Sequence, residues 1–126
     1  VGFIIFEATA IEPKGRISSH DVGFWDDEHI ALHKELVQEC HLYGAKMAIQ
    51  IAHAGRKSEV EDSTPISCSS LAFSDKKPFK TPLTASLEDI KNIKKLFLDA
   101  AIRAKKANYD AIELHAAHGY LLCQFL

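Results

Sequence analysis

Three short apolar runs, separated by two stretches with helical periodicity, constrain the fold of this chain most strongly. The runs cover residues 2–6, 45–51 and 111–114, and their length and apolar character are typical of buried strands. Between the runs, apolar residues recur at spacings of three and four, which is typical of one face of a helix. The alternation of strand and helix predicts an α/β fold with β-α-β crossovers and a parallel sheet.

The ends of the two predicted helices carry local signals of their own. Asp26 is placed to cap the first helix, and Gly44 stands where a C-terminal glycine cap belongs. Ser86 and Asp89 have the spacing of a capping box at the start of the second helix, which Asn108 closes. Four residues mark the expected buried face of the first helix: Leu32, Leu36, Cys40 and Tyr43.

Composition narrows the classes of function. The chain has 126 residues, 47% hydrophobic and 25% charged, which is ordinary for one globular domain. A net charge of −2 gives no reason to expect nucleic acid or a membrane as a partner. Three widely spaced cysteines predict a reducing, cytoplasmic compartment rather than a disulfide framework. Neither a G-x-G-x-x-G nor a P-loop motif is present, so a Rossmann or P-loop site is poorly supported.

Each predicted strand ends in small or polar residues. The strands run into residues 7–9, 50–56 and 115–120, which lie at one edge of the sheet if the strands are parallel. Gln50 places an amide in an apolar strand, where it needs a partner because an unpaired buried amide costs roughly 1–3 kcal/mol. A flat heterocycle with alternating C=O and N–H groups would satisfy this amide, and Ala8 would leave room for such a ring.

His115, His118 and Tyr120 bring three rings with transferable protons to the end of the last strand. Plainer interpretations stand beside a catalytic one. The two histidines are compatible with ordinary strand-end residues or with metal ligands, although no third ligand has a convincing spacing. Gln50 alone is equally compatible with a satisfied core amide. The helix and loop histidines are expected to be solvated: His20, His29, His33 and His41.

Four segments together resemble the old yellow enzyme family, most closely its bacterial branch of NADPH dehydrogenases and ene-reductases. They read IFEAT at 5–9, GRIS at 15–18, QIAHAGRK at 50–57 and ELHAAHGYL at 113–121. The resemblance implies a (β/α)8 TIM barrel. This chain would be roughly its second to fourth β/α units, one partial domain over residues 1–126, and we expect a piece of a longer protein.

The resemblance also implies cofactors, a substrate and residue roles. FMN would bind at the carboxyl ends of the strands, NAD(P)H would reduce it, and a small α,β-unsaturated carbonyl compound would accept the hydride. Ala8 would face the flavin ring and Gln50 its pyrimidine edge. His115, which also borders the cofactor, and His118 would grip the carbonyl oxygen of the alkene, and Tyr120 would be linked to proton delivery.

Two alternatives to this ene-reductase stay open. One is a metal-dependent barrel enzyme that uses His115 and His118, and the other is a non-catalytic barrel fragment that associates with another copy. The favoured interpretation needs no metal. The physiological alkene, the preference between NADH and NADPH, and homo-oligomerisation are not fixed by the sequence.

Overall fold

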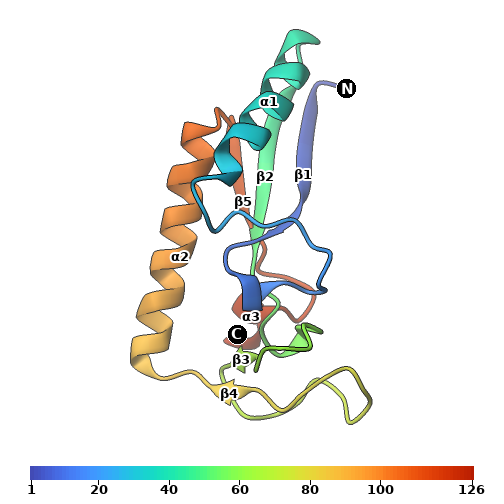
Figure 1. Cartoon of the computed structure of the whole chain (residues 1–126), viewed down its shortest axis with the longest axis vertical. Coiled ribbons are helices and arrows are strands. Elements are labelled where there is room, and N and C mark those ends of the chain that lie inside the picture. The colour runs from blue at the N-terminus through green and yellow to red at the C-terminus, as the bar shows by residue number, and fades with distance from the viewer.

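Three parallel strands form the main sheet of the computed structural model, which describes residues 1–126 (Figure 1). β1 (Phe3–Ala10) lies beside β2 (Lys46–Ala52), and β2 lies beside β5 (Ala111–Leu114), so that β2 is the central strand. Both pairings are parallel. The parallel α/β sheet that the alternation of elements predicts is therefore confirmed.

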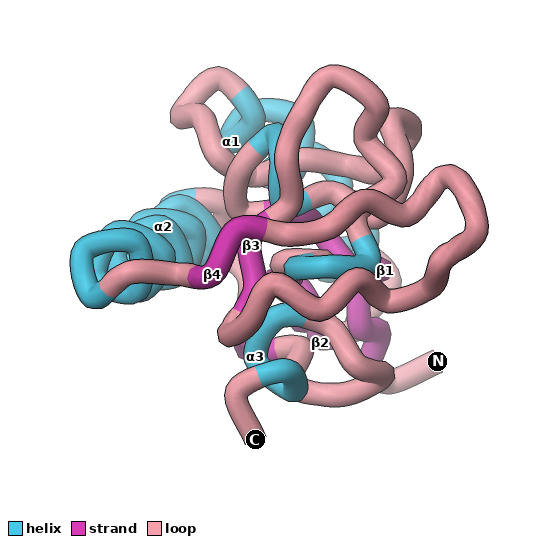
Figure 2. The backbone as a smooth tube through the Cα atoms, turned by 90° about the horizontal axis from the view of Figure 1, so that it is seen from below, coloured by secondary structure: helices cyan, strands magenta, loops and turns pink.

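The two long helices, α1 (His29–Leu42) and α2 (Leu87–Lys106), share one hydrophobic core with the central strand. Figure 2 shows α2 lying to one side of the strands. From β2, the core contains only alternate residues, Met47, Ile49 and Ile51. Because side chains alternate along a strand, the residues between them point to the opposite, helix-free face of the sheet.

Local capping signals set the ends of α2 and the C-terminal end of α1. The Ser86 hydroxyl accepts from the Asp89 N–H at 3.1 Å, and the Asp89 carboxylate accepts from the Ser86 N–H at 2.9 Å. This completes the predicted capping box. Gly44 and Asn108 follow the two helices with φ of 76° and 66°, the left-handed conformation that ends many helices. Both predicted C-terminal ends are confirmed.

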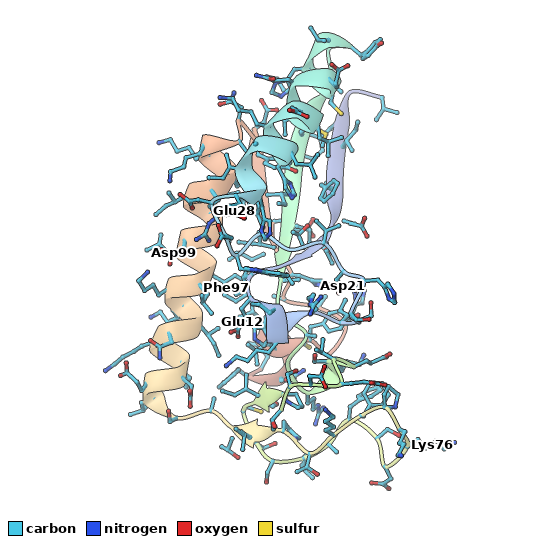
Figure 3. All side chains as sticks on the ribbon, in the orientation of Figure 1. Glu12, Asp21, Glu28, Lys76, Phe97 and Asp99 are labelled. Carbon is cyan, nitrogen blue, oxygen red and sulfur yellow. The ribbon has the colours of Figure 1, made fainter.

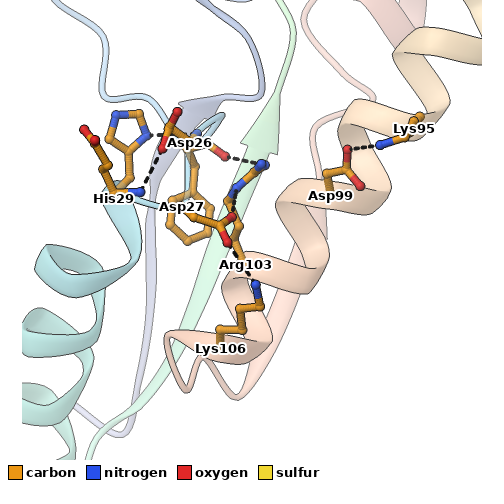
Figure 4. Close-up of polar contacts among 9 residues, drawn as sticks. Asp26, Asp27, His29, Lys95, Asp99, Arg103 and Lys106 are labelled. Atoms are coloured by element: carbon orange, nitrogen blue, oxygen red, sulfur yellow. Dashed lines mark hydrogen bonds and ion pairs between the residues drawn. The ribbon is translucent and has the colours of Figure 1, made fainter.

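The turn that precedes α1 is fastened to α2 (Figure 4). Asp26 does not cap α1 directly. Its carboxylate accepts from the N–H of Glu28, the N-cap residue, at 2.9 Å and so closes a turn just before the helix. The neighbouring Asp27 accepts from Arg103 Nε at 2.9 Å and Lys106 Nζ at 3.0 Å, both on α2. These ion pairs are exposed, so they orient the connection more than they stabilise the fold.

His33 is buried in the core, and the prediction that it is solvated was wrong. Its side chain lies between the rings of Phe6 and Phe24, with centroids at 5.3 and 4.3 Å. Its Nδ1 and the Tyr109 hydroxyl are hydrogen-bonded at 2.8 Å. Burial lowers the pKa of His33 from 6.5 to about 4, so the ring is neutral at pH 7.

The buried face of α1 is therefore offset from the one that the apolar spacing indicates. His33 and Val37 are the buried residues of the helix. Leu32 is 72% exposed and Tyr43 87% exposed. Two adjacent rows of side chains on α1 could serve as the buried face. The buried row contains His33, and it is overlooked when histidine is counted as a polar residue. Of the four residues on the predicted face, Cys40 does pack against the core, so the helix was predicted correctly and its buried face in part.

The outer strands are more exposed than the buried strands that the sequence predicts. All four residues of β5 are exposed, and Phe3 and Ile5 of β1 are each 49% exposed. β2 has a neighbour on each side, whereas β5 has one only, and no helix covers the face on which Ile5 lies. The apolar runs thus predict the strands correctly, but these 126 residues do not complete their burial.

The segment between β2 and α2 has little regular structure, as its composition indicates. Two-residue strands, β3 (Ile66–Ser67) and β4 (Leu83–Thr84), pair in parallel within it. Lys76 lies at the outer end of the loop between them (Figure 3). Three short elements complete the fold: 3-10 turns at Pro13–Gly15 (η1) and Gly55–Lys57 (η2), and helix α3 at Leu121–Gln124. None of the helices combines the length and the apolar character that crossing a membrane requires.

Candidate active site

A β-bulge places Ala8 beside Gln50. The pairing of β1 with β2 shifts by one residue between Phe6 and Thr9, so Ala8 and its neighbour Glu7 both stand opposite Gln50. The Thr9 hydroxyl donates to the Glu7 carbonyl at 2.7 Å within this bulge. Bulges are frequent beside active sites, where they redirect a side chain. The two residues predicted to face a flat ring therefore lie at one level of adjacent strands.

Gln50 points to the helix-free face of the sheet. Its neighbours Ile49 and Ile51 belong to the helix-covered core, and side chains alternate along the strand. Glu113 of β5 pairs with Gln50 in register and shares its face. The Gln50 side chain is half-buried, and its amide makes no hydrogen bond to another group of the chain. Its amide is thus available to a ligand with both donors and acceptors.

Three rings meet just beyond β5. The His115 N–H donates to the Ile51 carbonyl at 3.0 Å, which continues the pairing with β2 and fixes His115 at the edge of the sheet. The ring of His118 meets His115 edge-on with centroids 5.1 Å apart, and that of Tyr120 does so at 5.0 Å. His115 is buried, Tyr120 is half-buried and His118 is exposed. The fold thus gathers the three predicted side chains.

The surroundings of two rings set their protonation. Burial lowers the pKa of His115, the nearby His118 lowers it further, and Glu113 opposes this. The Ala117 N–H faces His115 Nδ1 at 3.4 Å, so the ring proton of the neutral form belongs on Nε2. Burial raises the pKa of the Tyr120 hydroxyl above 10.0, with smaller contributions from nearby carboxylates. At pH 7, His115 is a neutral donor and Tyr120 is protonated.

His53 and Glu12 form a pair that the sequence analysis missed (Figure 3 labels Glu12). His53 Nδ1 accepts from the Gly55 N–H at 3.0 Å, so Nε2 carries the proton and donates to Glu12 at 2.7 Å. The His53 carbonyl accepts from the N–H of Leu121, the residue after Tyr120, at 2.9 Å. A Cβ at Gly15 would come within 2.7 Å of the His53 ring. The G-R-I-S and H-x-G-R segments are therefore packed against each other.

Gln124 is a second residue that the sequence analysis missed. It lies in α3, and its Nε2 donates to the Gly119 carbonyl at 2.7 Å, between His118 and Tyr120. Lys57 Nζ donates to the neighbouring His118 carbonyl at 2.8 Å. A glutamine in a short apolar segment carries no recognisable signal, because its importance depends on contacts with residues distant in sequence.

The candidate site is an open edge of the sheet. None of the cavities of this chain is lined by the predicted site residues. The sheet of this chain has three strands, and Ile5 and Glu113 on its helix-free face are exposed. No group of three or more His, Cys, Asp or Glu side chains lies close enough to hold a metal ion. The metal-dependent alternative thus has no ligand set among these residues.

A family model described as "NADH:flavin oxidoreductase / NADH oxidase family" matches residues 1–126. The chain belongs to this family. The resemblance to old yellow enzymes that the four segments indicate is therefore confirmed. A NADPH dehydrogenase of Geobacillus thermodenitrificans (strain NG80-2) is 51% identical over 126 residues, which are 100% of this chain and 36% of that protein. One of Bacillus subtilis (strain 168) is 46% identical with the same coverage.

Solved structures agree with the family assignment. Morphinone reductase superposes with a TM-score of 0.92 at 33% identity, covering 98% of this chain and 38% of that one. A structure of morphinone reductase in complex with tetrahydroNAD gives 0.89 at 35% identity, covering 98% and 39%. The α/β sheet and its helices are thus part of a TIM barrel, as predicted. The chain spans little more than a third of the length of these relatives.

Proposed function

We propose that the whole protein containing this chain is an FMN-dependent oxidoreductase of the ene-reductase type. It would take hydride from NAD(P)H and transfer it, through the flavin, to the activated C=C bond of an α,β-unsaturated carbonyl compound. The observation that carries this proposal is the meeting of His115, His118 and Tyr120 at the sheet edge that also holds Gln50. The family description and the name NADPH dehydrogenase of its relatives support the flavin and nicotinamide parts.

The residues on the helix-free face fit a flavin ring. The half-buried Gln50 amide offers one acceptor and two donors to the pyrimidine edge of the ring. Ala8 lies beside it in the bulge, and its methyl group leaves space for a flat ring against the backbone. When bound, FMN would supply the hydride-transfer chemistry, which no side chain of this chain can perform.

The two imidazoles would bind and polarise the substrate carbonyl. Neutral His115 would donate from Nε2, and His118, whose ring meets that of His115 edge-on at 5.1 Å, would supply a second ring nitrogen to the same oxygen. Two such donors would stabilise the negative charge that develops on this oxygen, as in an oxyanion hole. Tyr120, protonated at pH 7, would deliver a proton to the α-carbon.

The test uses the full-length protein and a His115→Ala/His118→Ala variant. In rapid mixing, reduction of a cyclic enone by the pre-reduced enzyme should slow by about 10²–10³-fold, the loss typical of removing oxyanion donors. Binding of phenol, whose oxygen the same donors would hold, should weaken in parallel. Enone reduction at the wild-type rate in the double variant would remove the basis of this proposal.

His41→Gln is the matched control. His41 Nε2 bonds to Asp110 at 2.7 Å before β5 begins, so it lies at the opposite end of the strand from His115. Glutamine preserves a polar contact with Asp110. The control should reduce the enone at the wild-type rate. Treatment with a chelator should change the rate of neither the wild-type protein nor the control. Loss of activity with the chelator would favour the metal-dependent alternative.

A further inference from the structure

The side-chain amide of Gln124 joins three segments that are distant in sequence. Its Oε1 accepts from the Arg56 N–H at 3.2 Å and from the Ser67 hydroxyl at 2.9 Å. Its Nε2 donates to the Ala54 carbonyl at 3.2 Å and to the Gly119 carbonyl at 2.7 Å. Each amide atom therefore makes two hydrogen bonds, and the donors and acceptors around it permit only one orientation of the amide.

The turn that Gln124 holds has an unfavourable backbone. His118 has φ of 55° and Gly119 φ of 71°, so two consecutive residues are left-handed. Histidine has a Cβ and pays a steric penalty there, and such a conformation persists only where surrounding contacts impose it. Two side chains supply these contacts: Lys57 Nζ binds the His118 carbonyl, and Gln124 Nε2 binds the Gly119 carbonyl.

The backbone of η2 is shaped to receive the same amide. A Cβ built at Gly55 would lie 2.2 Å from Gln124 Oε1, and Gly55 has φ of 60°. Any side chain at this position would therefore displace the amide as well as strain the backbone. Gly55 belongs to the H-x-G-R segment that follows β2, so Gln124 couples the end of β2 to the turn that follows β5.

We propose that Gln124 is a positioning residue for the ring cluster. His115 is fixed independently, because its N–H pairs with β2. His118 and Tyr120 flank Gly119, so their edge-on approach to the His115 ring depends on the turn that Gln124 holds. The consequence for catalysis rests on the proposed function, in which these rings bind an enone and deliver a proton.

Gln124→Glu in the full-length holoenzyme tests this role. The carboxylate has the same shape and keeps both acceptor contacts, but it cannot donate to Ala54 or Gly119. Turnover of a cyclic enone per bound flavin should fall at least about tenfold, because small displacements of positioned groups cost this much or more. The ring signals of His118 in a nitrogen-15 histidine NMR spectrum should shift. Gln38→Glu, an exposed site on α1, is the matched control and should change neither.

Two results would overturn the proposal. One is turnover per bound flavin and His118 ring signals that match the wild type. The other is a lower melting temperature or flavin content with unchanged turnover per bound flavin, which would show that Gln124 supports the fold only. If the Gln124→Glu protein does not fold, Ser67→Ala decides: it removes one of the four hydrogen bonds and should change both readouts by a smaller amount, and no change contradicts the proposal.

Failure of the proposed function would give a different pattern. A wild-type protein that lacks flavin or does not reduce enones would remove the catalytic interpretation of His115, His118 and Tyr120. The NMR comparison of Gln124→Glu with Gln38→Glu needs no activity. It would still report whether the amide sets the position of the His118 ring.

Discussion

His53 Nε2 donates to Glu12 Oε1 at 2.7 Å across an interface between the ends of β1 and β2. The His53 side chain is fully buried and that of Glu12 is 13% exposed. The contact joins two segments that flank the candidate site, and it depends on the single proton that the histidine carries on Nε2.

Glu12→Ala should therefore destabilise the full-length protein by about 1–3 kcal/mol, because it leaves a buried imidazole N–H without a partner. Glu12→Gln keeps an acceptor oxygen at this position and should cost less. Glu35→Ala, on the exposed face of α1, is the control and should change the free energy of unfolding little. Chemical denaturation measures all three. Equal stability of the Glu12→Ala and Glu12→Gln proteins would show that the hydrogen bond contributes nothing.

His33 should make the fold sensitive to acid. Its pKa falls from 6.5 to about 4 on folding, so the unfolded chain binds a proton between these values and the native state does not. The free energy of unfolding therefore decreases as the pH falls from 6.5 to 4, by up to about 3 kcal/mol. Above pH 6.5 this histidine causes no further change.

A His33→Phe/Tyr109→Phe protein removes the buried hydrogen-bonded pair and replaces both partners with apolar rings. Its unfolding free energy, measured from pH 7 to 4, should decline less steeply than that of the wild type. Lys34→Gln, on the exposed side of the same helix, should keep the wild-type slope. The same slope in the double variant would contradict a neutral, buried His33.

Tyr120→Phe should slow the oxidative half-reaction with an enone by about 10²-fold, the lower range for loss of a proton donor. Because the pKa of Tyr120 is raised above 10.0, the hydroxyl stays protonated throughout the neutral range. The wild-type rate should therefore show no loss from this group below about pH 10. A wild-type rate in Tyr120→Phe at pH 7 would remove the tyrosine from proton delivery.

Sequence reasoning succeeded where the signal is local. The capping box at Ser86 and Asp89, and the left-handed residues Gly44 and Asn108, lie where their chemistry predicts. The three apolar runs form the three parallel strands, and their polar ends meet at one edge because parallel strands share their direction.

It failed where the answer depends on distant contacts. His33 is buried because Phe6, Phe24 and Tyr109, from three other segments, surround it. The importance of Gln124 likewise comes from partners that no periodicity reveals. The predicted roles of Ala8, Gln50 and the three rings at residues 115–120 follow from the family resemblance, and they remain predictions that the geometry permits.

Gln50→Ala should lower the flavin content of the purified full-length protein. The substitution removes the amide on the helix-free face that we assign to the pyrimidine edge of the ring. The ratio of flavin absorbance to protein measures the effect, and about tenfold weaker binding corresponds to the loss of one or two hydrogen bonds. Gln38→Ala, at an exposed position of α1, is the control and should retain full flavin content.

A crystal structure of the full-length protein with FMN and a phenol tests the central claim most directly. Our account predicts the Gln50 amide at about 3 Å from the pyrimidine edge of the flavin, and the phenol oxygen at about 3 Å from a ring nitrogen of both His115 and His118. A flavin bound away from Gln50, or a phenol oxygen that contacts neither imidazole, would contradict it.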